Sequence, residues 1–521
     1  MSDTADSAAA TAQSTSSPSP GGAGDDASQR LRKLVDQRLA QPAVRSQGTL
    51  RRSGAPDLAY DAIAEFLPVL SGSFNARPEE PQAAIFTLAY LAQPQLAPSG
   101  AAPAPAAAPR PVCFAFNGGP GSASIWLHLG ALGPKRVAIN PDGSMPPPPY
   151  AVSDNPHSWF DEFDLVFIDP PHTGYSITAS RAARKTMLGV DGDVAALAEV
   201  IHAWLARHRR FAAPLYLAGE SYGTTRGAAL ADKLLDHGIA LSGVILVSCA
   251  MDLQTLEFAP GNDLPHALFL PAYASTAQYH GKLAGALGAS PAAARAAAEA
   301  FVEEDYLAAL HLGARLGHDA RRRVAGRLAE LTGLPLGLVE EKNLRITDQT
   351  FFTHLLRDTG RIVGRLESRV SGPMGASRSH QWEFDPGIEA LVAPYTMAAQ
   401  AYFGAVLGID AGQRYEVLSN EVHEQWNWNR GKQRGNSYAC TSPDLARALR
   451  RNPHLRVFVA SGYYDLGTPY SATDYSLAQL DIPPDVARRV THHYFGAGHM
   501  MYTRQDDLAK LHADLKAWLV I

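Results

Sequence analysis

The chain has 521 residues, enough for a large hydrophobic core and an inserted subdomain. Its 46 lysines and arginines against 51 aspartates and glutamates give a formal net charge of −5 without a basic run, which argues against a nucleic-acid partner. No apolar stretch approaches the length of a transmembrane helix, so we expect no membrane partner. The three cysteines, Cys113, Cys249 and Cys440, lack metal-ligand spacing, and we expect neither a metal nor an organic cofactor.

The N-terminal residues 1–29 are rich in Ala, Ser, Thr, Gly and Asp and predict a disordered tail. This segment has neither the basic start nor the apolar core of a secretory signal, so the sequence favours the cytoplasm. A misassigned start would instead allow a periplasmic or secreted protein. Residues 30–66 predict an initial helix and a polar segment. Nothing in the sequence decides the oligomeric state, and a homodimer stays open.

Strands and helices then alternate as far as residue 251. Residues 83–91 predict a strand antiparallel to the next strand, and the Ala- and Pro-rich residues 93–111 between them predict an exposed loop. Further strands are expected at residues 112–116, 164–169, 214–218 and 243–248, and helices at residues 191–208 and 224–237. This alternation predicts an α/β fold with a mostly parallel central sheet covered by helices on both faces.

The pentapeptide Gly-Glu-Ser-Tyr-Gly at residues 219–223 lies between one of these strands and the helix that follows it. A serine between two glycines on a strand-to-helix turn is typical of the nucleophile elbow of α/β-hydrolases. The turn is so tight that side chains at the glycine positions would collide with neighbouring backbone, while the serine is forced outward. The pattern therefore predicts Ser221 as a nucleophile.

From about residue 252 the alternation stops. Residues 252–399 are mostly helix-forming, with an Ala- and Arg-rich part at 283–330, and predict a helical cap inserted over the C-terminal edge of the sheet. Residues 30–251 and 400–521 would then form the two parts of the hydrolase core. Trp426 and Trp428, just after the cap, either line a substrate groove or are half-buried packing residues, and the sequence leaves both open.

An acid and a base follow the elbow in the order that this fold requires. Residues 455–460 predict a strand that ends shortly before Asp465, and residues 490–495 predict another that ends before a glycine-rich loop carrying His499. Asp465 would hold the tautomer of His499, His499 would accept the serine proton, and Ser221 would attack a carbonyl.

Other acids and histidines compete for these roles. Asp474 lies in a more helix-like stretch than Asp465, and His492 and His493 lie within a predicted strand, where one of them would face the core. Only His499 combines a position after a strand with flanking glycines, so we favour Asp465 and His499.

The glycine-rich residues 117–121, directly after the strand 112–116, form a loop where backbone can approach a ligand closely. The amide hydrogens of Gly119 and of Tyr222, just after the nucleophile, would converge on a developing oxyanion. Loss of one such donor typically costs ~10²–10³ in rate. A plain glycine-proline turn is the alternative interpretation.

Four ordered motifs resemble those of the serine carboxypeptidases (peptidase family S10), and their variants look like the bacterial branch. They are Asn-Gly-Gly-Pro-Gly-Ser-Ala-Ser at 117–124, the elbow at 219–223, Tyr-Asp at 464–465 and Gly-His-Met at 498–500; residues 169–176 also resemble a segment of that family. The match covers roughly residues 80–250 and 400–521. The resemblance implies a peptide substrate, whose C-terminal carboxylate Asn117, Gly118 and Glu220 would bind, with Met500 as a further substrate-binding residue.

The chain departs from that family at two positions. Ala115 stands where the best-known members have a tryptophan, and Ala131 stands where a glutamate usually precedes Leu-Gly-Pro. That glutamate shares a proton with the elbow glutamate, a pair that works best at acidic pH. Without it, Glu220 would have to be protonated or find a cation. Arg226 is a candidate cation, although a surface helical arginine is the favoured alternative.

Together these features favour a serine hydrolase that acts through an acyl-enzyme, and within that class a carboxypeptidase that releases C-terminal residues from peptides. An esterase or acyltransferase using the same triad is the alternative, which Ala115 and Ala131 favour modestly. The intact triad argues against a third hypothesis, a catalytically inactive binding protein on this fold.

Overall fold

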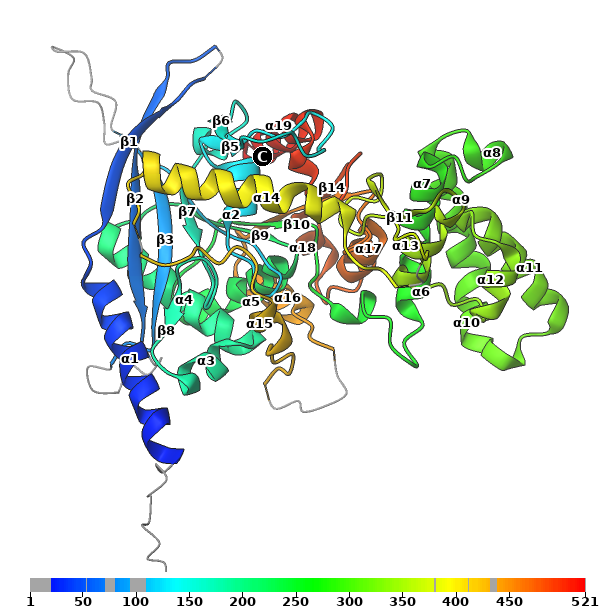
Figure 1. The fold of residues 1–521 in the computed structure, drawn as a ribbon, viewed down its shortest axis with the longest axis horizontal. Helices are drawn as coiled ribbons and strands as arrows, with labels where there is room; N and C mark the ends of the chain where they lie inside the picture. The colour runs from blue at the N-terminus through cyan, green and yellow to red at the C-terminus, as the bar shows by residue number, and fades with distance from the viewer. Residues whose placement is uncertain are drawn as a thin grey trace, which may run out of the picture.

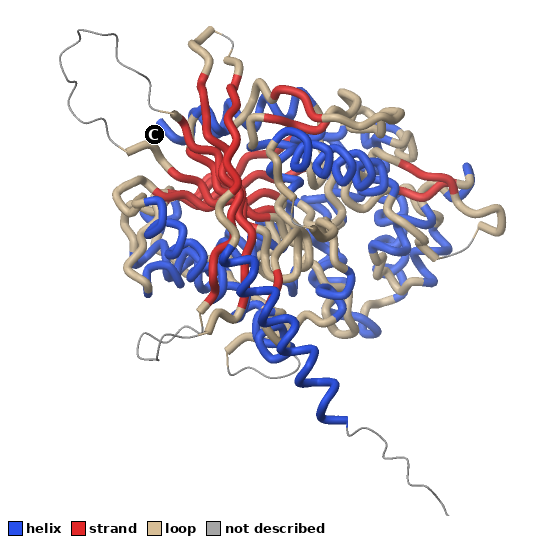
Figure 2. Tube along the Cα trace, turned by 60° about the vertical axis from the view of Figure 1, so that its left-hand side comes forward, coloured by secondary structure: helices blue, strands red, loops and turns tan. Residues whose placement is uncertain are grey.

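The computed structural model describes residues 20–520 apart from 53, 71–79, 94–108, 379–380, 411 and 432–437. A ten-stranded sheet forms its centre, and Figure 2 shows the strands as one twisted layer between helices. The strands are β1 (Val44–Leu50), β2 (Leu58–Val69), β3 (Ala83–Ala92), β4 (Val112–Phe116), β7 (Asp164–Ile168), β8 (Ile177–Thr178), β9 (Leu215–Glu220), β10 (Gly243–Val247), β13 (Arg456–Gly462) and β14 (Val490–Phe495). A separate hairpin pairs β5 (Lys135–Val137) with β6 (Val152–Asp154).

The strand order is β1-β2-β3-β7-β4-β9-β10-β13-β14, with β8 beside β3. The six strands from β7 to β14 are parallel, which confirms the predicted mostly parallel sheet, whereas β1, β2 and β3 run antiparallel to their neighbours. The strand at 83–91 does not pair with the next strand in the chain. A crossover connection inserts β7 between β3 and β4, a long-range arrangement that periodicity does not reveal.

Two predictions for the N-terminal region need correction. Helix α1 (Pro20–Ala40) begins inside the predicted disordered tail 1–29, whose first 19 residues lie outside the described residues. The predicted polar segment within 30–66 contains β1 and most of β2. Side chains of β1 alternate between half-buried and exposed because it is an edge strand with one solvated face, so its sequence is polar. Of the predicted loop at 93–111, residues 94–108 lie outside the described residues.

Helices cover both faces of the sheet. One face packs against a hydrophobic cluster that includes Tyr395 and Trp518, and the other packs against a cluster that includes Trp204 and Leu230. The helices of the core are α2 (Ile125–Leu127), α3 (Arg181–Met187), α4 (Val190–His208), α5 (Tyr222–Asp236), α14 (Pro386–Ala401), α15 (Asn420–Glu424), α16 (Ser442–Arg451), α17 (Tyr470–Ala478), α18 (Pro484–Ala487) and α19 (Gln505–Val520). No described helix has the length and apolarity that a membrane crossing needs.

The insertion after β10 gathers at one end of the molecule, opposite β1 to β3 (Figure 1), and has a hydrophobic cluster of its own. It comprises α6 (Leu264–Leu268), α7 (Leu270–Tyr279), α8 (Gly285–Gly288), α9 (Pro291–Phe301), α10 (Leu307–Leu312), α11 (His318–Thr332), α12 (Leu336–Glu341), α13 (Asp348–His354) and the hairpin β11 (Arg361–Val363) with β12 (Ser371–Pro373). We call this insertion the cap. The predicted boundary at residue 399 falls too late, because Leu391 and Tyr395 of α14 pack into the core cluster and not into the cap.

Candidate active site

Ser221 lies on the sharp turn between β9 and α5. Its φ is 58°, a left-handed conformation that a serine adopts only at a cost. A Cβ atom on Gly219 would lie 2.2 Å from the carbonyl oxygen of Gly223, and a Cβ on Gly223 would lie 2.8 Å from that of Phe116. Both contacts are too close, so the turn requires glycine on each side of Ser221. The steric argument for a nucleophile elbow is therefore confirmed.

Asp465 and His499 meet in the loops that follow β13 and β14. The His499 Nδ1 atom lies 2.7 Å from Oδ2 of Asp465. The other carboxylate oxygen, Oδ1, accepts hydrogen bonds from the amides of Gly467 (2.7 Å) and Thr468 (3.0 Å), and the Thr468 hydroxyl donates to Oδ2 at 2.7 Å. Because Nδ1 keeps its proton and donates it as a hydrogen bond to Asp465, Nε2 is the unprotonated, basic nitrogen of the ring.

The two groups shift each other's pKa in the direction that a general base needs. Burial by itself would raise the pKa of Asp465, but the facing His499 imidazole and the hydrogen bonds from His499 and Thr468 bring that pKa below its usual value. Burial by itself would lower the pKa of His499, but Asp465 raises it above its usual value. Asp465 thus stabilises the imidazolium that forms when His499 accepts a proton.

Asp474, the competing acid, belongs to a different hydrogen-bonded chain. Its Oδ1 accepts from Nδ1 of His492 at 2.8 Å and from the hydroxyl of Tyr494 at 2.7 Å. The Nε2 atom of His492 lies 2.9 Å from the hydroxyl of Ser461, which is fully buried in β13. This chain repeats the residue types of a triad, but its serine lacks access to a substrate.

The predicted oxyanion loop lies directly against the elbow. A Cβ on Gly118 would lie 2.4 Å from the amide nitrogen of Tyr222, so only glycine permits this approach. Gly119 has a φ of +101°, and Tyr222 is the first residue of α5, where amides lack an intrahelical acceptor. Within the described part of the chain, neither amide has a hydrogen-bond acceptor, so both are available to an oxyanion.

Glu220 is buried next to the nucleophile, with 3% of its surface exposed. Its Oε2 accepts hydrogen bonds from the Asn117 side-chain amide (2.9 Å) and from the Tyr502 hydroxyl (2.7 Å). Burial raises the pKa of Glu220 to about 7, with Asp465 adding to the rise, although His499, Tyr502 and Asn117 oppose it. The sequence did not point to Tyr502, because an apolar context three residues beyond His499 carries no signal of such a contact.

Both sequence interpretations of Arg226 are wrong. Its side chain is buried. It donates hydrogen bonds from Nε to Asp193 Oδ2 at 2.6 Å and from Nη1 to the Asn117 carbonyl at 2.6 Å. The guanidinium also lies 5.3 Å from the ring centres of Phe116 and Tyr222. Arg226 is thus neither a surface residue nor the cation of Glu220, because Asp193 already takes its charge. It fixes the loop that carries Asn117.

A cavity of about 430 Å³ opens beside Ser221. Its lining combines core and cap residues: Gly119, Ser221, Tyr222, Leu253, Phe269, Asp348, Arg365, Trp428 and Thr468 are among them. Trp428 therefore lines the cavity, whereas Trp426, 8% exposed, packs edge-on against Tyr222. Met500 is 7% exposed and belongs to the core cluster, so its predicted contact with substrate stays a prediction.

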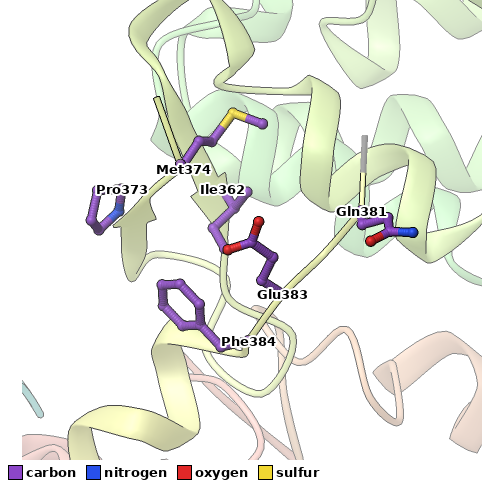
Figure 3. A pocket seen from close by; sticks show the side chains of 7 residues that line it. Ile362, Pro373, Met374, Gln381, Glu383 and Phe384 are labelled. Atoms are coloured by element: carbon purple, nitrogen blue, oxygen red, sulfur yellow. The ribbon is translucent and has the colours of Figure 1, made fainter. Parts of the chain in front are cut away.

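A second, small hollow lies at the base of the β11–β12 hairpin. The side chains around it include Ile362, Pro373, Met374, Glu383 and Phe384 (Figure 3). Its volume of about 10 Å³ is close to the minimum for a single water molecule, so it is too small for a substrate.

Comparison with known proteins finds similarity to serine carboxypeptidases over part of the chain. Residues 103–255, which contain the predicted oxyanion loop and the elbow, match the family model described as serine carboxypeptidase, Peptidase_S10. This part of the chain is therefore similar to the serine carboxypeptidase family. Among curated proteins, serine carboxypeptidase-like 7 of Arabidopsis thaliana is 30% identical over 115 residues, or 22% of this chain and 25% of the relative. Serine carboxypeptidase-like 13 of the same organism is 28% identical over 149 residues, or 28% of this chain and 34% of the relative.

The chain thus spans between a quarter and about a third of the length of these curated serine carboxypeptidase relatives. Among solved structures, the prohormone-processing carboxypeptidase Kex1(Δ)p from Saccharomyces cerevisiae superposes with a TM-score of 0.53 at 16% identity. That alignment covers 88% of this chain and 91% of the other. Together with the parallel sheet and its flanking helices, it establishes the α/β-hydrolase fold for this protein.

Proposed function

We propose that the protein is a serine-type carboxypeptidase that releases C-terminal residues from peptides through an acyl-enzyme. The observation that carries this proposal is the 2.7 Å contact between His499 and Asp465, in loops that follow β13 and β14 at the same end of the parallel sheet as the Ser221 elbow. The match of residues 103–255 to the serine carboxypeptidase model supports the peptidase class, and the cavity beside Ser221 provides room for a substrate residue.

In the proposed reaction, His499 Nε2 accepts the proton of Ser221 as the serine oxygen attacks the substrate carbonyl. The amides of Gly119 and Tyr222 stabilise the tetrahedral oxyanion. His499 then gives its proton to the leaving amine, which departs as the released C-terminal amino acid. Water, activated by the same histidine, hydrolyses the acyl-enzyme and regenerates Ser221.

Glu220 supports recognition of a free C-terminus. With its pKa near 7, it is largely protonated in mildly acidic solution and then presents a hydrogen-bond donor. Asn117 and Tyr502 both donate to Oε2, so the proton of neutral Glu220 lies on Oε1. A protonated Oε1 can donate to a substrate carboxylate, and a second glutamate at position 131 is not needed for this.

The proposal is tested by digesting a mixed peptide library and following the products by mass spectrometry. We expect successive loss of single residues from free C-termini and much slower turnover of the same peptides with amidated C-termini. A fluorophosphonate probe should label Ser221, and Ser221→Ala should abolish both labelling and turnover. Labelling that persists in Ser221→Ala would refute the nucleophile, and cleavage at internal bonds would refute the exopeptidase activity.

An esterase or acyltransferase is the second candidate. It is favoured by Ala131, which is fully buried in the core and cannot supply the carboxyl group that a glutamate at this position would offer to Glu220. If free and amidated peptides were turned over at similar rates while simple esters were hydrolysed quickly, this second function would replace the first.

A further inference from the structure

Arg365 places a positive charge in the cavity beside Ser221. It follows β11 in the turn of the cap hairpin, and it lines the same cavity as Ser221, Tyr222 and Thr468. Its guanidinium carbon lies 3.4 Å from the point that a Cβ on Gly467 would occupy, two residues beyond Asp465. The guanidinium is therefore close to the acid of the proposed triad.

The backbone of Arg365 is held from two sides. The amides of Arg365 and Leu366 donate to the buried carboxylate of Asp385 at 2.9 and 3.1 Å. On the opposite side, the Arg365 carbonyl accepts from the amide of Leu466 at 2.9 Å, and the Leu366 carbonyl accepts from the amide of His499 at 2.7 Å. Arg365 thus keeps a fixed position relative to both triad loops.

Burial raises the pKa of Asp348 and of Asp385, and the charge of Arg365 opposes that rise at a distance, but Arg365 forms no direct ion pair within the described part of the chain. Its guanidinium makes no hydrogen bond, ion pair or ring contact there, although the side chain is half-buried. Two acids line the same cavity, yet neither lies within ion-pair distance. Asp348 accepts the Gln349 amide at 2.7 Å, and Glu257 is exposed to solvent. The guanidinium thus keeps its hydrogen-bond donors for a ligand, and a ligand carboxylate could accept two parallel hydrogen bonds from it.

The anion belongs to the acyl part of the substrate. The group that would bind a terminal carboxylate, Glu220 with Asn117 and Tyr502, is buried and does not line this cavity. The cavity is thus left for the residue whose carbonyl Ser221 attacks. Its apolar walls, which include Leu253, Leu256 and Phe269, suit the methylene groups of a side chain, and Arg365 suits a charge at the end.

We propose that Arg365 is a specificity-determining residue that binds an anionic side chain, as in aspartate or glutamate, on the acyl side of the scissile bond. This rests on the proposed acyl transfer at Ser221. A planar guanidinium pairs with a carboxylate in two-point geometry, which a neutral amide of the same shape cannot match.

The test compares matched substrates that differ only in this charge. The first pair is two free-acid tripeptides with Glu or Gln in the penultimate position. The second pair consists of two p-nitrophenyl esters. The anionic member is mono-p-nitrophenyl glutarate, and the neutral member is p-nitrophenyl 4-carbamoylbutyrate. We expect kcat/KM to favour the anionic member of each pair by about tenfold or more, as for a hydrogen bond to a charged group.

Arg365→Gln should remove this preference and leave turnover of the neutral substrates within about threefold of the starting protein. Arg365→Lys should keep part of the preference, because the charge remains but the two-point geometry is lost. Asp348→Asn is the matched control in the same cavity and should retain or increase the preference.

Three outcomes would overturn the proposal: equal turnover within both pairs, a preference for the neutral member of each pair, or an equal loss on charged and neutral substrates in Arg365→Gln. The ester pair separates this proposal from the carboxypeptidase function. If peptides are not cleaved but esters are, the exopeptidase proposal fails while the charge preference of Arg365 is still measured.

Discussion

At the scale of single residues, two His-Asp pairs lie in the C-terminal region that contains β13 and β14. His499 pairs with Asp465, and His492 links Asp474 to Ser461. The Nδ1 to carboxylate distances, 2.7 Å and 2.8 Å, do not separate these two pairs. The backbone does, because Ser221 lies on a strained elbow beside a cavity, whereas Ser461 is fully buried within a regular strand. The nucleophile is therefore defined by the turn that presents it.

Replacing Asp465 and Asp474 in turn would show which of the two His-Asp pairs serves catalysis. Asp465→Asn should lower kcat by about 10⁴, because an amide no longer stabilises the imidazolium and favours the wrong tautomer of His499. Asp474→Asn, the matched control, should leave kcat within about twofold. Steady-state kinetics on one peptide and one ester would check both values. A large loss in Asp474→Asn, with little change in Asp465→Asn, would mean that the acid has been assigned to the wrong pair.

Glu220 predicts the pH dependence of substrate binding. Ionisation above its pKa of about 7 would set an anion beside the substrate carboxylate, so KM for free peptides should rise above neutral pH. On the acid side, kcat should fall as His499 becomes protonated, and Asp465 moves this fall to higher pH by raising the pKa of His499.

Profiles of kcat/KM against pH would show both effects, an acid limb due to His499 and an alkaline limb due to Glu220. Glu220→Gln should lose the alkaline limb and keep the acid limb, and amidated peptides should lack the alkaline limb in the unaltered protein. An optimum confined to acidic pH, as a glutamate pair would give, would contradict this account.

At the scale of secondary-structure elements, the ion pair of Arg226 with Asp193 joins α5 to α4. Both side chains are at most 1% exposed, with an Nε to Oδ2 distance of 2.6 Å. Burial raises the pKa of Asp193, whereas the charge of Arg226 lowers it, which shows how far this carboxylate depends on its partner. The same guanidinium holds the Asn117 carbonyl, so the pair also supports the oxyanion loop.

Arg226→Met should destabilise the core by about 3–5 kcal/mol, because Asp193 is left as a buried charge without a partner. Combining it with Asp193→Leu should recover much of that loss, since no buried charge then remains. Urea unfolding of the single and double variants would measure the difference. A double variant as unstable as Arg226→Met alone would indicate that packing, and not the uncompensated charge, sets the cost.

The sequence predicts the features that depend on neighbouring residues, but not the contacts between segments far apart in the chain. The elbow, the strands β9, β10, β13 and β14 and the loops of Asp465 and His499 carry local signals, namely glycine spacing and short apolar runs. The order of β3, β7 and β4 in the sheet has no such local signal, because it depends on which strand the crossover connection places next to β3. Arg226 gave a polar helical signal, since its partner Asp193 lies 33 residues earlier. Arg365 and Tyr502 were likewise missed because their contacts come from distant segments.

At the scale of the whole molecule, the cap and the core are built around separate hydrophobic clusters. They meet at the proposed active site, where the hairpin segment 364–368 bonds to both triad loops. Leu366 accepts the His499 amide at 2.7 Å, and the Ser368 amide donates to the Tyr464 carbonyl at 3.0 Å. The core therefore supplies the triad, but the cap holds its loops in place.

This arrangement predicts that activity is lost before the core unfolds. A unit with its own small cluster opens with a lower free energy than the sheet, whose central strands are buried on both faces. Rising urea should thus abolish ester hydrolysis in a first transition, in which amides of residues 264–373 exchange with solvent, while amides of β4, β9 and β10 stay protected.

Hydrogen exchange followed by mass spectrometry, with turnover measured in the same samples, would resolve the two steps. Asp385→Ala should move the first transition to lower urea by more than the second, because that carboxylate binds the amides of Arg365 and Leu366 at 2.9 and 3.1 Å as well as the Gly387 amide at the start of α14 at 2.9 Å. Glu389→Ala, an exposed acid four residues away on α14, is the control and should move neither. A single transition shared by activity, cap and core would show that the two clusters unfold as one cooperative unit, and the cap would then have no separate role in holding the triad.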